Sequence, residues 1–216
     1  MPEVTPHSAP DPLGPQRPWL LVIDPQRVFT DPTSQWRVPR WEEIVEPVRR
    51  LVPAFGDRVV LTRWVPKTEK HGSWRDYFRE YQFADRPADH PTFALDERLA
   101  DLSWPHTVLA PTFGKWTAEM RELTGPDPHL VVAGVATDCC VISTVLPAVD
   151  DGARVTVVTD GCAGSTDEAH EAAMSVMAGY FPQAALRSTD EVLPMLEQAA
   201  AEAGDDCAPA SVRATG

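Results

Sequence analysis

The sequence predicts an α/β fold, a three-layer αβα sandwich around a mostly parallel sheet of five to six strands. Short apolar runs alternate along the chain with segments whose apolar residues recur at helical spacing. Polar residues rarely interrupt the apolar runs, which is typical of strands buried on both faces of a parallel sheet. Alternating strands and helices also favour right-handed crossovers, so helices should cover both faces of the sheet.

The first part of the chain contains two apolar runs, one helical pattern and a long loop. Residues 19–24 read Trp-Leu-Leu-Val-Ile-Asp, a buried strand that ends in an acid, and residues 58–63 form the second strand. Between them, residues 41–55 have helical spacing and stop before Gly56. Residues 64–91 are aromatic and charged without a clear period, and so long a loop in a compact domain is usually functional.

The second part of the chain continues the alternation. Apolar runs predict further strands at residues 106–109, 130–133, 155–160 and 184–187. Helical spacing predicts helices at residues 143–150, 167–180 and 189–203.

Length and local composition predict one domain with two unstructured ends. At 216 residues the chain can build one full core and is short for two. Residues 1–17 are rich in proline and lack the basic and apolar regions of a secretory signal, so we expect a flexible leader. Residues 204–216 are small and polar, and we expect a disordered tail. The domain should therefore span residues 18–203.

Charge, the length of the apolar runs and the cysteine content argue against nucleic acid, a membrane and an oxidising compartment as surroundings of this chain. The net charge is −13 and no basic stripe is present, which argues against nucleic acid. No apolar stretch approaches the ~20 residues that span a bilayer, so no membrane association is expected. The four cysteines do not have the spacing of a secreted disulfide scaffold, which indicates the reducing cytoplasm.

Two adjacent cysteines, Cys139 and Cys140, stand where the strand at 130–133 ends and a helix begins. The free N–H groups of a helix's first turn can lower the pKa of a thiol and hold an oxyanion. A nucleophilic cysteine hydrolase would place its nucleophile at this point. Two other interpretations stay open: buried cysteines that serve as small apolar residues, and a redox pair, although adjacent cysteines form a strained ring.

Three chemically useful positions follow strand ends. Asp24 ends the first strand, Lys115 follows the third, and the cysteine pair follows the fourth. Ligands of parallel α/β sheets bind outside the carboxyl ends of the strands. These positions could therefore share one crevice, although an aspartate at a strand end is often only a turn residue.

The chain resembles the isochorismatase-like cysteine hydrolase superfamily over about residues 19–193. The Asp-Pro-Gln of residues 24–26, with Phe29 beyond, resembles the family's opening motif. Residues 134–144 resemble its nucleophile motif, G-x-x-T-D-x-C-V-x-x-T, and residues 157–165 resemble the strand and turn that follow. The resemblance implies a Rossmann-like fold and a hydrolase.

The register of this motif assigns roles by resemblance. Cys139 fills the variable position and Cys140 precedes valine, so Cys140 is the implied nucleophile. The resemblance implies that Asp24 is the general base and that Lys115 is the catalytic cation, although the family's usual lysine position falls on Ala110. It also implies an oxyanion hole made by the N–H groups of Ala136 and Cys140, with a cis peptide bond before Ala136.

The expected pocket is aromatic and free of metal. Gln26, Phe29, Trp64 and Trp116 are the candidate substrate-binding residues. Nicotinamidases of this superfamily hold a metal with an Asp-x-His pair after the second strand, where this chain has Arg63-Trp64-Val65. We therefore expect no metal and no cofactor.

The resemblance implies a metal-independent cysteine amidohydrolase that cleaves a C–N amide or N-carbamoyl bond of a small molecule through a thioester. Alternatives are an isochorismatase-type vinyl-ether hydrolase, a non-catalytic binding protein that keeps the fold, and a redox sensor. The expected partners are a small-molecule substrate and other copies of the chain, in a homodimer or homotetramer.

Overall fold

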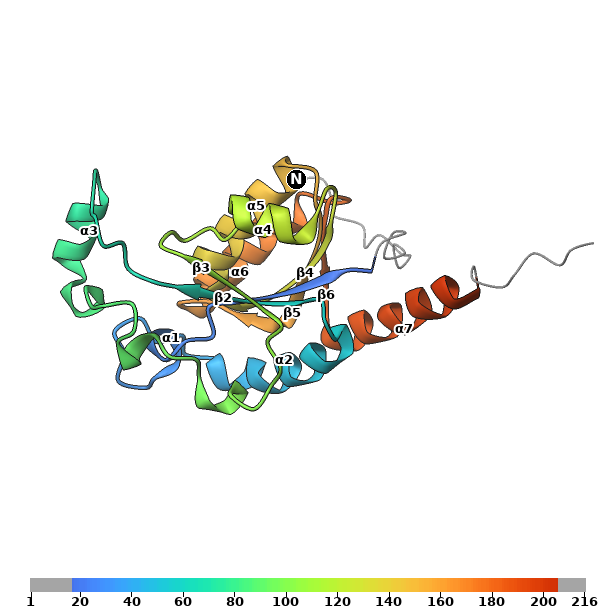
Figure 1. Cartoon of the computed structure of the whole chain (residues 1–216), viewed down its shortest axis with the longest axis horizontal. Helices are drawn as coiled ribbons and strands as arrows, with labels where there is room; N and C mark the ends of the chain where they lie inside the picture. The colour runs from blue at the N-terminus through green and yellow to red at the C-terminus, as the bar shows by residue number, and fades with distance from the viewer. Residues whose placement is uncertain (1–16, 206–216) are drawn as a thin grey trace, which may run out of the picture.

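The computed structural model describes residues 17–205, which form a six-stranded sheet between two layers of helices (Figure 1). All strand pairs are parallel, and the spatial order is β3-β2-β1-β4-β5-β6. The strands are β1 Trp19–Ile23, β2 Val59–Trp64, β3 His106–Ala110, β4 His129–Val135, β5 Arg154–Ala163 and β6 Ala184–Arg187. The predicted αβα sandwich is therefore confirmed. Residues 1–16 and 206–216, which hold nearly all of the predicted leader and tail, lie outside the described residues.

Seven α-helices and four other helical turns connect the strands of the described region. The α-helices are α1 Arg27–Thr30, α2 Trp41–Phe55, α3 Trp74–Glu80, α4 Ala118–Thr124, α5 Ile142–Asp150, α6 Asp167–Ala178 and α7 Thr189–Asp205. The short turns are η1 Gln82–Ala84, η2 Pro91–Phe93, η3 Glu97–Leu99 and the π-helical turn η4 Thr137–Val141.

The two faces of β1 divide the core. Leu20 and Val22 belong to an apolar cluster shared with α2 and α7, whereas Leu21 and Ile23 belong to a second cluster shared with α4, α5 and α6. All four side chains are fully buried. A strand covered on both faces needs apolar residues at every position, which explains the uninterrupted apolar run in the sequence.

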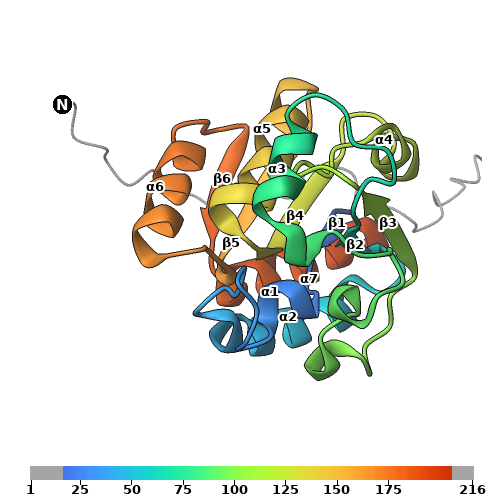
Figure 2. The same cartoon turned by 90° about the vertical axis from the view of Figure 1, so that its left-hand side faces the viewer.

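The predicted loop at residues 64–91 is wrong in part, because it contains α3 and η1. Its aromatic residues Trp74, Tyr77, Phe78 and Tyr81 have the i, i+3, i+4, i+7 spacing of one helix face. Phe78 is buried, and its ring lies 6.1 Å from that of Trp64. The helix thus packs its aromatic face toward the body. It lies beyond the carboxyl ends of the strands (Figures 1 and 2).

Helix α4 was not predicted, although its signals are local. The Thr117 hydroxyl accepts a hydrogen bond from the N–H of Met120 (3.2 Å), and Gly125 follows the last helical residue. A threonine cap and a glycine stop are typical ends of a helix. The buried Met120 side chain anchors this short helix on the sheet, and the helix in turn fixes the segment that carries Lys115.

Candidate active site

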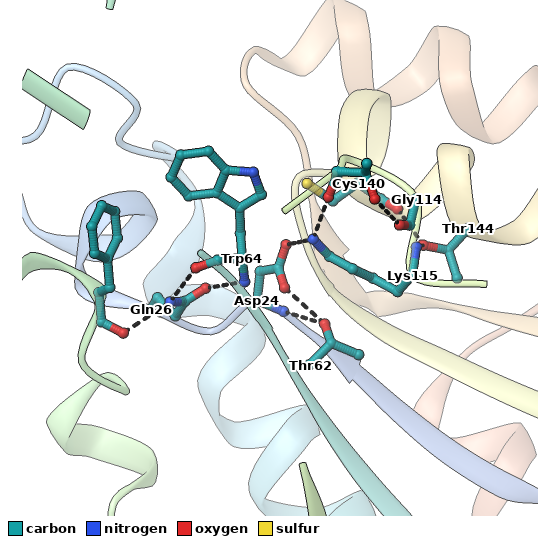
Figure 3. Close-up of polar contacts among 10 residues, drawn as sticks. Asp24, Gln26, Thr62, Trp64, Gly114, Lys115, Cys140 and Thr144 are labelled. Carbon is teal, nitrogen blue, oxygen red and sulfur yellow. Dashed lines mark hydrogen bonds and ion pairs between the residues drawn. The ribbon is translucent and has the colours of Figure 1, made fainter. Parts of the chain in front are cut away.

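The candidate site lies at the carboxyl ends of β1 and β4, which are neighbours in the sheet (Figure 3). Ile23 pairs with Gly134, so Asp24 and the turn that leads to the cysteines start from the same edge. A Cβ atom on Gly134 would lie 2.3 Å from the carbonyl oxygen of Ile23, and the φ of Gly134 is +115°. Only glycine permits this approach, which brings the two loops together.

Asp24 and Lys115 form a fully buried ion pair. The distance from Lys115 Nζ to Asp24 Oδ2 is 2.8 Å, and neither side chain is exposed. The other carboxylate oxygen accepts a hydrogen bond from the Thr62 hydroxyl (2.8 Å), which accepts one from the Asp24 N–H (3.1 Å). Lys115 Nζ also donates to the carbonyl oxygen of Thr112 (2.8 Å). The pair therefore has a fixed geometry.

A tight approach at Gly114 explains how Lys115 reaches the site from its shifted position in the sequence. A Cβ atom on Gly114 would lie 2.5 Å from the carbonyl oxygen of Ser143 in α5. The Lys115 N–H donates to the Thr144 hydroxyl (2.9 Å), which donates to the carbonyl oxygen of Cys140 (2.7 Å). The backbone of Lys115 is thereby tied to the turn that carries the candidate nucleophile.

The two cysteines differ in exposure and in acidity. Cys140 is 3% exposed and Cys139 is half-buried. A hydrogen bond to Cys139, burial and the Asp24 carboxylate raise the pKa of Cys140, and Lys115 opposes them. The same hydrogen bond outweighs burial at the other thiol and lowers the pKa of Cys139. A helix N-terminus alone would lower the pKa of Cys140, so the neighbouring thiol and burial decide the outcome here.

Both residues of the predicted oxyanion hole lie at the candidate site. Ala136 and Cys140 line a cavity of about 290 Å³. The peptide bond between Val135 and Ala136 is cis, as the resemblance implies. Cys140 lies in the turn η4, which ends where α5 begins.

Aromatic side chains form one wall of this cavity. Trp36 is their common neighbour: its ring is nearly parallel to that of Phe29 (6.0 Å, 10°) and lies 5.4 Å from that of Trp64. Tyr77 and Tyr81 of the α3 region also contact Trp36. Sequence reasoning placed Phe29 and Trp64 in the wall, and both line the cavity. It missed the other aromatic residues that line it, which are Trp36, Tyr77, Tyr81 and Phe113.

Gln26 is not among the residues that line this cavity. It is fully buried, and its amide donates to the carbonyl oxygens of Trp64 (3.0 Å) and Phe93 (2.8 Å). Its amide oxygen accepts a hydrogen bond from the N–H of Trp64 (2.7 Å). Gln26 thus joins β1 to the end of β2 and to η2, and its role in the structure is to hold the pocket wall.

Trp116 was expected in the pocket wall, and the structure places it elsewhere. Its indole N–H donates to Asp151 (2.8 Å), and the Arg121 guanidinium lies 5.9 Å from the ring centre. It packs against the core cluster on the α4–α5 side of the sheet. Lys115 and Trp116 are adjacent in the sequence, but their side chains point to different surroundings. The sequence alone therefore could not show that only one of the two reaches the site.

Asp138 fixes the nucleophile turn to the segment before α6. Its two carboxylate oxygens accept hydrogen bonds from the Ser165 N–H (2.7 Å) and hydroxyl (2.6 Å). The neighbouring Thr137 hydroxyl shares a hydrogen bond with Nδ1 of His170 in α6 (2.9 Å). These contacts tie the turn to α6 and to the segment before it.

Within residues 17–205, no three His, Cys, Asp or Glu side chains are grouped closely enough to hold a metal ion. Over the same residues, no helix is long and apolar enough to cross a membrane.

Comparisons with known proteins agree with this architecture. A family profile described as isochorismatase domain matches residues 18–191. A protein of Arabidopsis thaliana described as a probable inactive nicotinamidase is 29% identical over 164 residues, which are 71% of this chain and 84% of the relative.

Two solved structures show the same fold. A cysteine hydrolase from Pseudomonas syringae superposes with a TM-score of 0.74 and 22% identity, over 87% of this chain and 96% of the other. The N-carbamoylsarcosine amidase of Thermoplasma acidophilum superposes with a TM-score of 0.63 and 17% identity, over 81% and 98% of the two chains.

Proposed function

The chain belongs to the isochorismatase family, and we propose that it is a cysteine amidohydrolase that cleaves a C–N amide or N-carbamoyl bond of a small molecule. The observation that carries this proposal is the fully buried Lys115–Asp24 pair, whose charges both act on the Cys140 thiol. Burying a charge pair costs desolvation energy that the pair seldom returns as stability. Such a pair beside a nucleophilic side chain in a pocket supports a catalytic role.

In the proposed reaction, Cys140 Sγ attacks the carbonyl carbon while its proton passes to the Asp24 carboxylate. The N–H groups of Ala136 and Cys140 hold the oxyanion that forms. The C–N bond then breaks, and the nitrogen takes the proton from Asp24 and leaves as an amine or ammonia. Water adds to the thioester carbonyl carbon and gives a proton to Asp24. The C–S bond breaks, Cys140 regains the proton, and the acid product leaves.

Lys115 has an electrostatic role in this proposal. Its positive charge opposes the groups that raise the pKa of Cys140, so it favours the thiolate during attack. It also balances the Asp24 carboxylate while that carboxylate is charged. The cavity of about 290 Å³ and its aromatic wall favour a small substrate with a flat or apolar part.

We further propose that the reaction needs no metal ion. The end of β2, where a relative could supply ligands, carries Arg63 and the buried Trp64. An arginine and an indole are not metal ligands. Activity that survives exhaustive chelation would support this part of the proposal, and activity restored only by added Zn²⁺ or Mn²⁺ would overturn it.

The deciding experiment measures ammonia release from a panel of small primary amides and N-carbamoyl compounds in chelator-treated buffer. The wild type is compared with Cys140→Ser, which keeps the volume, and with Cys140→Ala. We expect turnover in the wild type and a loss of at least about 1,000-fold in both variants, because alanine has no nucleophile and the serine hydroxyl is a much weaker one than a thiolate. Equal release from all three proteins would exclude Cys140 as the nucleophile.

A non-catalytic binding protein is the second candidate. Two observations favour it: the raised pKa of Cys140 and the description of the Arabidopsis relative as probably inactive. It predicts that amides bind to wild type and Cys140→Ala with equal affinity, while neither protein releases ammonia. Intrinsic fluorescence can report such binding, because Trp36 and Trp64 line the cavity.

A further inference from the structure

The proposed mechanism uses one thiol of an adjacent pair and leaves Cys139 without a role. Both cysteines line the same cavity. Tyr77 also faces this cavity, and the pKa of its hydroxyl is raised, mainly by burial and to a smaller extent by the charges of the two thiolates. They differ in access, since Cys139 is half-buried and Cys140 is 3% exposed. A molecule that enters the cavity therefore meets the Cys139 sulfur more readily.

We propose that Cys139 is a reversible modification site, which takes up a small thiol as a mixed disulfide and so obstructs the cavity in front of Cys140. The reactivity of a thiol toward disulfides depends on its access and on its thiolate fraction. The cavity gives Cys139 the access, and its partner Cys140 supplies a hydrogen bond that favours the thiolate and lowers the pKa of Cys139.

The other described cysteine does not compete. Cys162 is 4% exposed, and its thiol donates to the carbonyl oxygen of Val132 (3.6 Å). Burial raises its pKa to about 12. Cys162 is therefore almost entirely protonated at neutral pH and shielded from a disulfide in solution.

The co-reactant is a low-molecular-weight disulfide, and the step is an exchange. The Cys139 thiolate attacks one sulfur of the disulfide, a bond forms between the two sulfurs, and the original S–S bond breaks. The second sulfur leaves as a thiolate and takes a proton from water. Cys139 is oxidised and one half of the disulfide is reduced, and an added thiol reverses the exchange.

The local backbone disfavours closure of the two cysteines into a disulfide with each other. Both lie within the turn η4, where the N–H groups of Cys139 and Val141 donate to the carbonyl oxygen of Ala136 (3.0 and 3.1 Å). A disulfide between adjacent residues needs a backbone geometry that a helical turn does not provide. The mixed disulfide should therefore persist until an external thiol removes it.

The test uses the full chain with Cys207→Ser, because Cys207 lies outside the described residues. This protein and its Cys139→Ser and Cys140→Ser derivatives are treated with 2-hydroxyethyl disulfide, and adducts are located by intact mass and peptide mapping. We expect one adduct, on Cys139, in the parent and in Cys140→Ser, reversed by dithiothreitol. In Cys139→Ser the adduct should form at least about 10-fold more slowly.

In the parent protein, an adduct on Cys140 or a Cys139–Cys140 disulfide without an adduct would overturn the assignment. Equal rates of adduct formation in the parent and in Cys139→Ser would overturn it as well. Peptide mapping of the parent decides the case even if a serine variant fails to fold. The test of the obstruction rests on the proposed amidase activity: ammonia release is measured before and after modification of Cys139. Unchanged release from fully modified protein would overturn the obstruction, whereas absence of all turnover would refute the amidase and leave the mass result valid.

Discussion

Replacing Lys115 by methionine should leave the Asp24 carboxylate buried without its cation. The two charged atoms are 2.8 Å apart and fully buried. At an effective dielectric constant of about 20, their attraction is about 6 kcal/mol before desolvation is counted. Loss of one partner from a buried pair costs about 3–5 kcal/mol of folding free energy, because the remaining charge is uncompensated. We expect a loss in this range for K115M.

The assay is urea unfolding of the wild type, K115M, D24N and the double variant D24N/K115M. The double variant has no charge left at positions 24 and 115, and the side-chain amide introduced by D24N can still contact the Thr62 hydroxyl. It should therefore be more stable than the sum of the single losses predicts, by about 2–3 kcal/mol. K67M is the matched control, since it removes one positive charge from a half-buried lysine over the Trp74 ring and should cost less than about 1 kcal/mol.

Two results would refute this reasoning. A loss below about 1 kcal/mol in K115M would show that removing the partner of Asp24 costs no more than breaking a surface ion pair. Strictly additive losses in the double variant would show that the two charges do not interact. Either result would also remove the electrostatic argument that supports a catalytic role for the pair.

Two other substitutions test the surroundings of the site. G114A places a Cβ atom 2.5 Å from the Ser143 carbonyl oxygen, so calorimetry should show a free energy of unfolding that is lower by about 1–3 kcal/mol. Ammonia release should also fall, because Lys115 shifts. An unchanged melting temperature together with unchanged ammonia release would contradict the close approach. Burial tends to raise the pKa of Asp96, but hydrogen bonds from Arg98 prevail and lower it to about 2. Because this folded-state pKa is depressed, the stabilisation is present above pH ~4 and is lost as pH falls toward 2. Urea unfolding at pH 7 should therefore show D96N to be about 1–2 kcal/mol less stable than the wild type, and this difference should vanish near pH 2. A stability difference that does not depend on pH would contradict the depressed pKa of Asp96.

The strands and the longer helices could be predicted because each carries its own periodicity. Helix α2 has the predicted bounds, Trp41–Phe55, and β6 has the predicted Ala184–Arg187. The short helices α3 and α4 were missed, since seven residues give less than two full periods of a helical pattern. In α3 the aromatic residues do have helical spacing, but the charged residues between them and the many aromatic residues nearby obscured this pattern.

The candidate site was only partly predictable. Asp24 and Cys140 follow directly from strand ends, whose position at one edge of the sheet is a rule of parallel α/β folds. Of the pocket wall, Phe29 and Trp64 were predicted, whereas Trp36 and Phe113 could not be, because they lie in loops without a period. Gln26 and Trp116 were expected at the pocket, and the structure places both among packing contacts away from the cavity lining, since a polar or aromatic residue near a motif can as well serve packing.

The sequence by itself determined the parallel αβα architecture and the position of the cysteine pair at a strand-to-helix junction, since both depend on the order and type of neighbouring residues. Only the tertiary structure decided that Lys115 reaches Asp24, and that the lower pKa belongs to Cys139. The first depends on the close approach of Gly114 to α5, and the second on burial and on the groups around the thiols. Distances between residues remote in sequence and the extent of their burial are set by packing, so local patterns do not encode them.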